Sequence, residues 1–444
     1  MRLVRLPAYE DLPPAIQRSL ALSLREVIPA AVMVGVVETY AVPFGLFFHA
    51  TTAQIGLLVS LPQLLGACSL LLVVPLVQRL GSRLRFAVLG ASLQIVVLLL
   101  VAGLALVECP NRLGALIALM AAYRVVFHLI VPAFGSLMSE YLPAGKRGGY
   151  FGLRTRILGI SQILGTALAG AVLFVAGQRA AAVGFFLVFL MAALARSVSA
   201  RLLSRMADLP LSPEHPLGVS SFALGRTADR NVVRYAAYVA GILFTTFLAA
   251  PYFSVYMLRE LRFNYLTYTG VQLASMIAGI ATVPVWGRHA DAVGNAKVLK
   301  VTGALLPAGA LLWLVSSHPA YLIAVEACSG VLWAGFNLCV TNFIYDAVSP
   351  PQRIRVLASC NLVNALAMCS GAFAGGWLAE RLPPLFGARL LSLMALSGLL
   401  RLAVYLALAH RVREVRTGHQ KVSSRQLLFS VLGIGSLDIP APTE

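Results

Sequence analysis

Long blocks of apolar residues without any charge constrain this chain more than any other feature. One block, residues 86–107, reads FAVLGASLQIVVLLLVAGLALV. An α-helix that crosses the hydrocarbon core of a bilayer needs about 20 apolar residues. In lipid every backbone polar group must also be paired internally, which leaves helices and closed barrels as the only spanning structures. A block of this length therefore predicts a transmembrane helix.

The same criterion predicts twelve such spans, and so an all-α polytopic membrane protein. Composition agrees, because 59% of the residues are hydrophobic and only 12% are charged. A soluble domain has about 25% charged residues. The predicted spans are 27–49, 54–78, 84–107, 113–141, 151–177, 180–203, 231–256, 265–287, 297–316, 319–346, 353–380 and 386–410.

The chain is strongly basic, with 35 Lys and Arg residues against 17 acidic ones. In a soluble protein this excess would suggest nucleic-acid binding. Here the basic residues gather in every second loop, as Arg83 and Arg85 do after the second span and Lys146 and Arg147 after the fourth. This is the positive-inside pattern. We expect a plasma (bacterial inner) membrane protein with both termini in the cytosol and no nucleic-acid partner.

A polar loop, residues 204–230, divides the spans into two groups of six. Segments EYLPAGKR (140–147) and DAVSPPQR (346–353) share an acid, six residues and an arginine, at an offset of 353 − 147 = 206. The same offset relates Gly165 to Gly371. Two six-helix bundles of parallel topology follow. The expected domains are a cytosolic lead-in (1–26), bundles 27–203 and 231–410, a cytosolic linker (204–230) and a cytosolic tail (411–444).

The loops after the second and eighth spans carry related motifs. They read VPLVQRLGSRLR (74–85) and GRHADAVGNAKV (287–298). Through them the chain resembles the major facilitator superfamily, whose loop motif is Gly-x-x-x-Asp-Arg-x-Gly followed by basic residues. The first copy has Gln78 where the motif has an acid. The resemblance implies two six-helix halves and a charged gate that closes the cytosolic face.

The gate has a physical interpretation beside the resemblance. Gly287 is small, so we expect a neighbouring helix to pack closely there. Gly294 suits a tight turn. The alternative is an ordinary turn with charges that only set topology. The expected gate residues are Arg79, Gly81, Arg83, Glu140, Arg147, Gly287, Asp291, Gly294, Lys297, Asp346 and Arg353.

Two charges lie deep inside predicted spans, Glu38 in the first and Arg124 in the fourth. A charge at a helix centre is costly and usually faces a partner or a cavity. Each lies roughly 16 Å from the outer end of its span at 1.5 Å per residue, so the two can meet. An ion pair that merely ties two helices is the alternative. Further candidates, from the spans that line the cavity by resemblance, are His128, Tyr252, Tyr256, Glu326, Trp333 and Asn337.

These features predict a secondary active transporter for a small polar or anionic solute. Glu38 would carry the coupling proton, and two rocking halves would give alternating access. We expect a monomer with no enzymatic activity, because no catalytic residue cluster is visible. No nucleotide-binding motif or metal-ligand spacing occurs, so we also expect no cofactor and no metal. A non-transporting sensor or assembly factor, and efflux of amphipathic compounds, remain the alternatives.

Overall fold

The computed structural model describes residues 9, 11–177, 179–210, 229–415, 426 and 430. Within these ranges the chain forms helices long and apolar enough for twelve membrane spans, which confirms the predicted fold class. Several observed boundaries lie close to the expected ones. The third span, for example, runs from Arg83 to Leu104, against an expected 84–107. Hydrophobic length alone fixes such boundaries.

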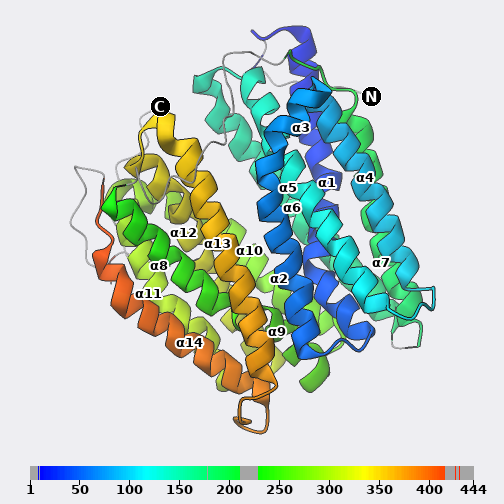
Figure 1. The fold of residues 1–444 in the computed structure, drawn as a ribbon, viewed down its shortest axis with the longest axis vertical. Coiled ribbons are helices and arrows are strands. Elements are labelled where there is room, and N and C mark those ends of the chain that lie inside the picture. Colours follow the sequence, from blue (N-terminus) through cyan, green and yellow to red (C-terminus); the bar gives the residue numbers. More distant parts are fainter. Residues whose placement is uncertain are drawn as a thin grey trace. The chain divides into compact units, whose positions relative to one another are not determined.

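The chain divides into two compact units. Unit 1 covers residues 1–219 together with 262–269, and unit 2 covers the remaining segments, 220–261 and 270–444. In Figure 1 the chain is coloured from blue at its start to red near its end.

Each unit pairs its helices in a similar way. In unit 1, α1 packs against α6 and α7, and α4 packs against α5 and α7. In unit 2, α8 packs against α13 and α14, and α11 packs against α12 and α14. The helices of unit 1 are α1 (Pro14–Phe47), α2 (Thr52–Ser69), α3 (Val73–Leu80), α4 (Arg83–Leu104), α5 (Arg112–Tyr141), α6 (Ala144–Ala176) and α7 (Ala181–Leu203). Those that follow are α8 (Arg230–Phe247), α9 (Ala250–Val255), α10 (Tyr265–Val293), α11 (Asn295–Leu311), α12 (Pro319–Ala347), α13 (Pro350–Ala379) and α14 (Arg389–Leu408).

Two spans are interrupted helices. A single 3₁₀ turn, Leu70–Leu72, joins α2 to α3, and together they form the span Thr52–Leu80. The span Arg230–Glu260 consists of α8, α9 and a π-helical turn over Tyr256–Glu260. Such turns within helices are frequent at functional sites.

Equivalent glycines bring helices together in both units. A side chain added at Gly165 of α6 would lie 2.7 Å from Cα of Val32 on α1. One added at Gly371 of α13 would overlap the backbone of Phe244 on α8. Small residues allow this close approach of helix backbones in membranes. These two glycines are the pair related by the 206-residue offset.

The first helix starts earlier than expected. We predicted a span from residue 27, but α1 begins at Pro14, and Leu20, Ser23 and Glu26 on it are buried. Proline is favoured in the first turn of a helix, where its missing N–H is not needed. The apolar-run criterion stopped at Arg25 and Glu26, because it could not recognise that the carboxylate of Glu26 has partners inside the bundle.

Helix α10 is shared between the units. Its first residues, Tyr265–Thr269, belong to unit 1, and the rest of the helix belongs to unit 2. The hydroxyl oxygens of Tyr40 and Thr269 lie 2.6 Å apart. Tyr268 donates a hydrogen bond to the carbonyl of Thr39 at 2.9 Å. Two tyrosine hydroxyls therefore attach the start of α10 to α1.

Candidate functional site

The structure brings Glu38 of α1 and Arg124 of α5 together. Nη2 of Arg124 donates to Oε2 of Glu38 at 2.6 Å. The side chains are partly open, with 24% of Arg124 and 34% of Glu38 exposed. Because some of the pair remains accessible, another charged group could approach it, which a fully enclosed ion pair would not allow.

His128 adjoins this pair. Its Nδ1 lies 2.9 Å from the carbonyl oxygen of Arg124, one turn earlier on α5. A carbonyl oxygen only accepts hydrogen bonds, so Nδ1 carries the proton and Nε2 is left for other contacts. Gly66 of α2 makes room for both residues, because a side chain there would lie 2.6 Å from Nδ1 of His128 and 2.9 Å from Cγ of Arg124.

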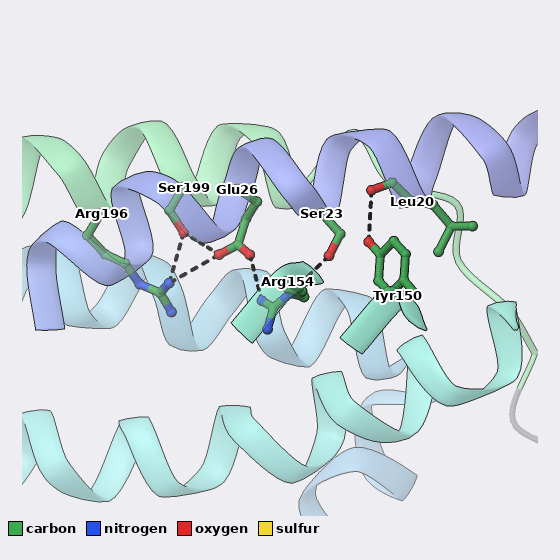
Figure 2. Close-up of polar contacts among 7 residues, drawn as sticks. All are labelled: Leu20, Ser23, Glu26, Tyr150, Arg154, Arg196 and Ser199. Atoms are coloured by element: carbon green, nitrogen blue, oxygen red, sulfur yellow. Dashed lines mark hydrogen bonds and ion pairs between the residues drawn. The ribbon is translucent and has the colours of Figure 1, made fainter. Parts of the chain in front are cut away.

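A second group of charges, which the sequence analysis did not single out, is centred on Glu26 (Figure 2). Its Oε2 accepts from Nη2 of Arg154 on α6 at 3.2 Å, and its Oε1 accepts from Ser199 on α7 at 2.7 Å. Arg196 on α7 approaches Oε1 at 3.8 Å and donates to Ser199 at 2.9 Å. Side chains of Glu26 and Arg196 are only 5% and 6% exposed. One carboxylate thus joins α1 to two other helices.

A polar cavity of about 190 Å³ lies within unit 2. It contains a carboxylate, Glu326 on α12, and a guanidinium, Arg401 on α14. Oε1 of Glu326 accepts from the indole of Trp313 at 3.2 Å. The rest of the lining is Thr246, Ala250, Phe253, Ser254, Gln272, Ser275, Gly309, Ala310, Trp313, Ser329 and Trp333.

Of the other sequence candidates, only Glu326 and Trp333 line this cavity. Tyr252 is buried elsewhere, and its hydroxyl donates to the carbonyl of Ala372 on α13 at 2.6 Å. Tyr256 is 5% exposed, with its ring edge against Trp313. Asn337 is exposed and is absent from the lining. Helical spacing places these residues on their spans, but it does not tell which of them line the cavity and which pack against neighbouring helices.

Arg401 and Arg196 are two further residues that sequence reasoning missed. Each lies well inside a predicted span, 386–410 and 180–203 respectively, whereas Arg389 and Arg201 lie near the ends of the same spans. Buried positions in the structure leave them 4% and 5% exposed. The same rule that singled out Glu38, that intramembrane charges mark partners or cavities, would have found both.

Two of the expected gate residues of unit 1, Arg83 and Glu140, form an ion pair. Nη1 and Nη2 of Arg83, at the start of α4, both contact the carboxylate of Glu140, near the end of α5. Gln78 stands where the family motif has an acid. Glu140 supplies the carboxylate instead. Gly81 ends α3 with a φ of 66°, and Arg79 is exposed.

Unit 2 has a related arrangement around Asp346. Nδ2 of Asn295, the first residue of α11, donates to Oδ2 of Asp346 near the end of α12 at 2.6 Å. Gly294 precedes it with a φ of 91°, the left-handed conformation that we expected of a tight turn. Our expectation of close helix packing at Gly287 is wrong, because a side chain added there would meet nothing within 4 Å.

The paired acid-and-arginine segments share one further contact. Nε of Arg147 donates to the carbonyl of Leu142 at 3.0 Å, and Nε of Arg353 donates to the carbonyl of Val348 at 2.9 Å. Both arginines satisfy a carbonyl at the end of the preceding helix. The remaining gate candidates are the exposed Asp291, on the last turns of α10, and the half-buried Lys297, in the first turn of α11.

Together these features define a class: a polytopic helical membrane protein whose intramembrane charges are held in pairs or around a polar cavity. A family comparison makes the class specific. The model of the Major Facilitator Superfamily matches residues 27–222 and 235–437. The chain therefore belongs to the major facilitator superfamily.

Curated relatives match over shorter stretches. The efflux pump dotC of Dothistroma septosporum is 32% identical over 109 residues, which are 24% of this chain and 19% of that protein. The vacuolar membrane amino acid uptake transporter fnx2 of Schizosaccharomyces pombe is 25% identical over 179 residues, 40% of this chain and 30% of that protein. The chain thus matches less than a third of the length of these relatives.

Solved structures resemble the chain over most of its length. The nucleoside transporter NupG has a TM-score of 0.66 at 12% identity, covering 90% of this chain and 100% of that one. A bacterial homologue of the iron transporter ferroportin has a TM-score of 0.65 at 15% identity, covering 88% and 98%. At this identity the likeness concerns the fold alone.

Proposed function

We propose that the protein is a proton-coupled secondary transporter of a small polar or anionic solute. The observation that carries this proposal is the partly exposed ion pair between Glu38 and Arg124 within two membrane spans. An intramembrane charge is costly unless it faces a partner or serves a pathway. Family membership supports transport as the activity, and the named relatives include an amino acid transporter and an efflux pump.

Proton binding and solute binding would compete at this pair. When Glu38 takes a proton, its carboxylate loses its charge and its hold on Arg124 weakens. An anionic group of the solute could then occupy the guanidinium in place of Glu38. His128, whose Nε2 is not used by the contact with Arg124, is the next proton carrier to test.

Alternating access would use the two units as its moving parts. On this proposal both chain termini lie in the cytosol of a plasma-membrane transporter. The loops around Arg83–Glu140 and Asn295–Asp346 would then form its cytosolic gate. Because these contacts fix the start of one helix to the end of the next in each unit, they would keep the gate regions of each unit intact while the units move.

The proposal is tested with purified protein in proteoliposomes that contain a pH-sensitive dye. Amino acids, nucleosides and small organic anions are added one by one, and solute-dependent proton movement is recorded. We expect Glu38→Gln to abolish uptake driven by a pH gradient while retaining passive exchange, and Arg124→Ala to remove both.

Glu108→Gln is the matched control, because it removes a 95% exposed carboxylate paired with Arg112 and should leave transport unchanged. Unchanged pH dependence in Glu38→Gln would refute proton coupling at this pair.

A further inference from the structure

The cavity of unit 2 contains a buried cation, Arg401, that forms no direct ion pair with any described residue. Arg401 is only 4% exposed. Its Nη1 donates to the carbonyl of Leu306 at 3.3 Å, and its Nε has no hydrogen-bond partner. Among the described residues no carboxylate forms an ion pair with it. A buried guanidinium without an anion is strongly unfavourable, so the site is suited to an incoming anionic group.

The cavity also contains an acid, Glu326, that has no direct ion pair within the described part of the chain. Glu326 lines the same space, and its carboxylate accepts hydrogen bonds from the indole N–H of Trp313 and from the hydroxyl of Ser275. Within the ranges that the structure describes, no Lys or Arg lies within 4.0 Å of its carboxylate. Opposite charges thus share one cavity and attract each other, but within the described residues they form no direct ion pair. A simple anion would be repelled by Glu326 and a simple cation by Arg401, so the complementary ligand carries both charges.

The volume and the other walls limit the ligand further. An apolar cavity of about 150 Å³ accommodates benzene, with six heavy atoms. On that scale about 190 Å³ accommodates roughly eight heavy atoms. Phe253, Trp313 and Trp333 supply aromatic surface for an apolar side chain. Aromatic faces also attract an ammonium group.

We propose that unit 2 binds a small zwitterionic amino acid with an apolar side chain. Its carboxylate pairs with Arg401 and its ammonium with Glu326, while the aromatic rings contact the side chain. Arginine favours a carboxylate because its planar fork can donate two parallel hydrogen bonds. The site is distinct from the Glu38–Arg124 pair, which belongs to unit 1. Binding there needs no ion gradient.

Binding is measured by titration calorimetry on the full chain in nanodiscs, without any gradient. The probes are L-leucine, L-leucinamide, which lacks the carboxylate, and 4-methylpentanoate, which lacks the amine. We expect L-leucine to bind at least about tenfold more tightly than either analogue, because each analogue leaves one buried charge without a partner. Equal affinity for L-leucine and either analogue, or no binding of L-leucine, overturns the proposal.

Two variants then assign the charges. Arg401→Gln should remove the preference for L-leucine over L-leucinamide, and Glu326→Gln should remove the preference over 4-methylpentanoate. Arg389→Gln is the matched control, since Arg389 is exposed at the start of the same helix, α14. Wild-type affinity of Arg401→Gln for L-leucine would place the binding site elsewhere and overturn the proposal.

The proposal does not depend on either variant folding well. If Arg401→Gln is unstable, the two analogues test the same charges on the unaltered protein, and Arg401→Lys keeps the charge while removing the fork. The proposals of proton coupling and of amino-acid binding fail in different measurements. If proton coupling at Glu38 is wrong, Glu38→Gln keeps its pH-driven uptake. If the binding site in unit 2 is wrong, L-leucine does not bind in the absence of a gradient.

Discussion

Glu26 provides the sharpest test of how this fold is held together. Among the described residues, its carboxylate is the one acid that forms ion pairs with the guanidiniums of Arg154 and Arg196 (Figure 2). In Glu26→Gln the size of the side chain is kept and the charge is lost. Arg196, 5% exposed, would then remain buried without an anion. Arg154 is less affected, since its side chain is 20% exposed and lies over the ring of Phe134.

The expected loss in the free energy of unfolding follows from the difference in burial between Arg196 and Arg154. Removing one partner of a buried ion pair costs about 3–5 kcal/mol. Because only Arg196 is fully enclosed and the amide of Gln can still accept from Ser199, we expect the lower end, about 3 kcal/mol. This is roughly a 100-fold shift of the unfolding equilibrium.

The free energy of unfolding is measured by titrating SDS into the purified protein in dodecyl maltoside micelles. Arg196→Gln is measured alone and together with Glu26→Gln. The double variant should lose less than the sum of the two single losses, because the two residues interact directly. Glu108→Gln, the exposed control, should change the free energy by less than about 1 kcal/mol.

Two results would refute this reasoning. One is an unfolding free energy of Glu26→Gln equal to that of the unaltered protein. The other is strict additivity in the double variant, which would mean that the two side chains do not interact.

Three further changes test other sites. Gly66→Ala should destabilise the protein by about 1–3 kcal/mol through overpacking against His128, seen as a lower melting temperature; an unchanged value would mean that α2 can move away. Asp11 accepts a hydrogen bond from Lys146, which lowers the pKa of the carboxyl below 3.8; the associated stability is present above 3.8 and is lost as the pH falls through the lowered value. A ¹³C-NMR titration of Asp11 should show this low midpoint and its rise towards the ordinary value in Lys146→Gln. Asp291→Asn should slow transport if the gate proposal holds, and a normal rate would leave the motif with a topological role only.

The fold can be predicted from the sequence because a membrane span depends on a property of one continuous stretch of residues. A span needs only length and apolarity, and the polar loop 204–230 with the 206-residue offset indicated the division into halves. The contact between Glu38 and Arg124 could also be anticipated, because depth along a helix is a matter of counting residues. Neither step needs knowledge of how helices rotate about their axes.

The unit 2 cavity could not be predicted, because it depends on helix rotation. Residues from five spans meet there, and no spacing in the sequence relates Gln272 on α10 to Arg401 on α14. Periodicity placed Tyr252 and Trp333 on faces of their helices, but only packing shows that one face meets α13 and the other a cavity. The prediction of close packing at Gly287 was wrong because a small residue permits close packing without requiring it.

The shared helix α10 has a mechanical consequence. A continuous α-helix is stiff along its axis, so the first turns of α10 cannot be displaced without displacing the turns that follow them. The joint lies where Tyr40 and Tyr268 hold the first turns of α10 to α1. Each such hydrogen bond contributes only about 1 kcal/mol net, so breaking both shifts a conformational equilibrium by roughly 30-fold. The attachment of α10 to α1 is therefore specific in its geometry and still weak enough to open in thermal motion.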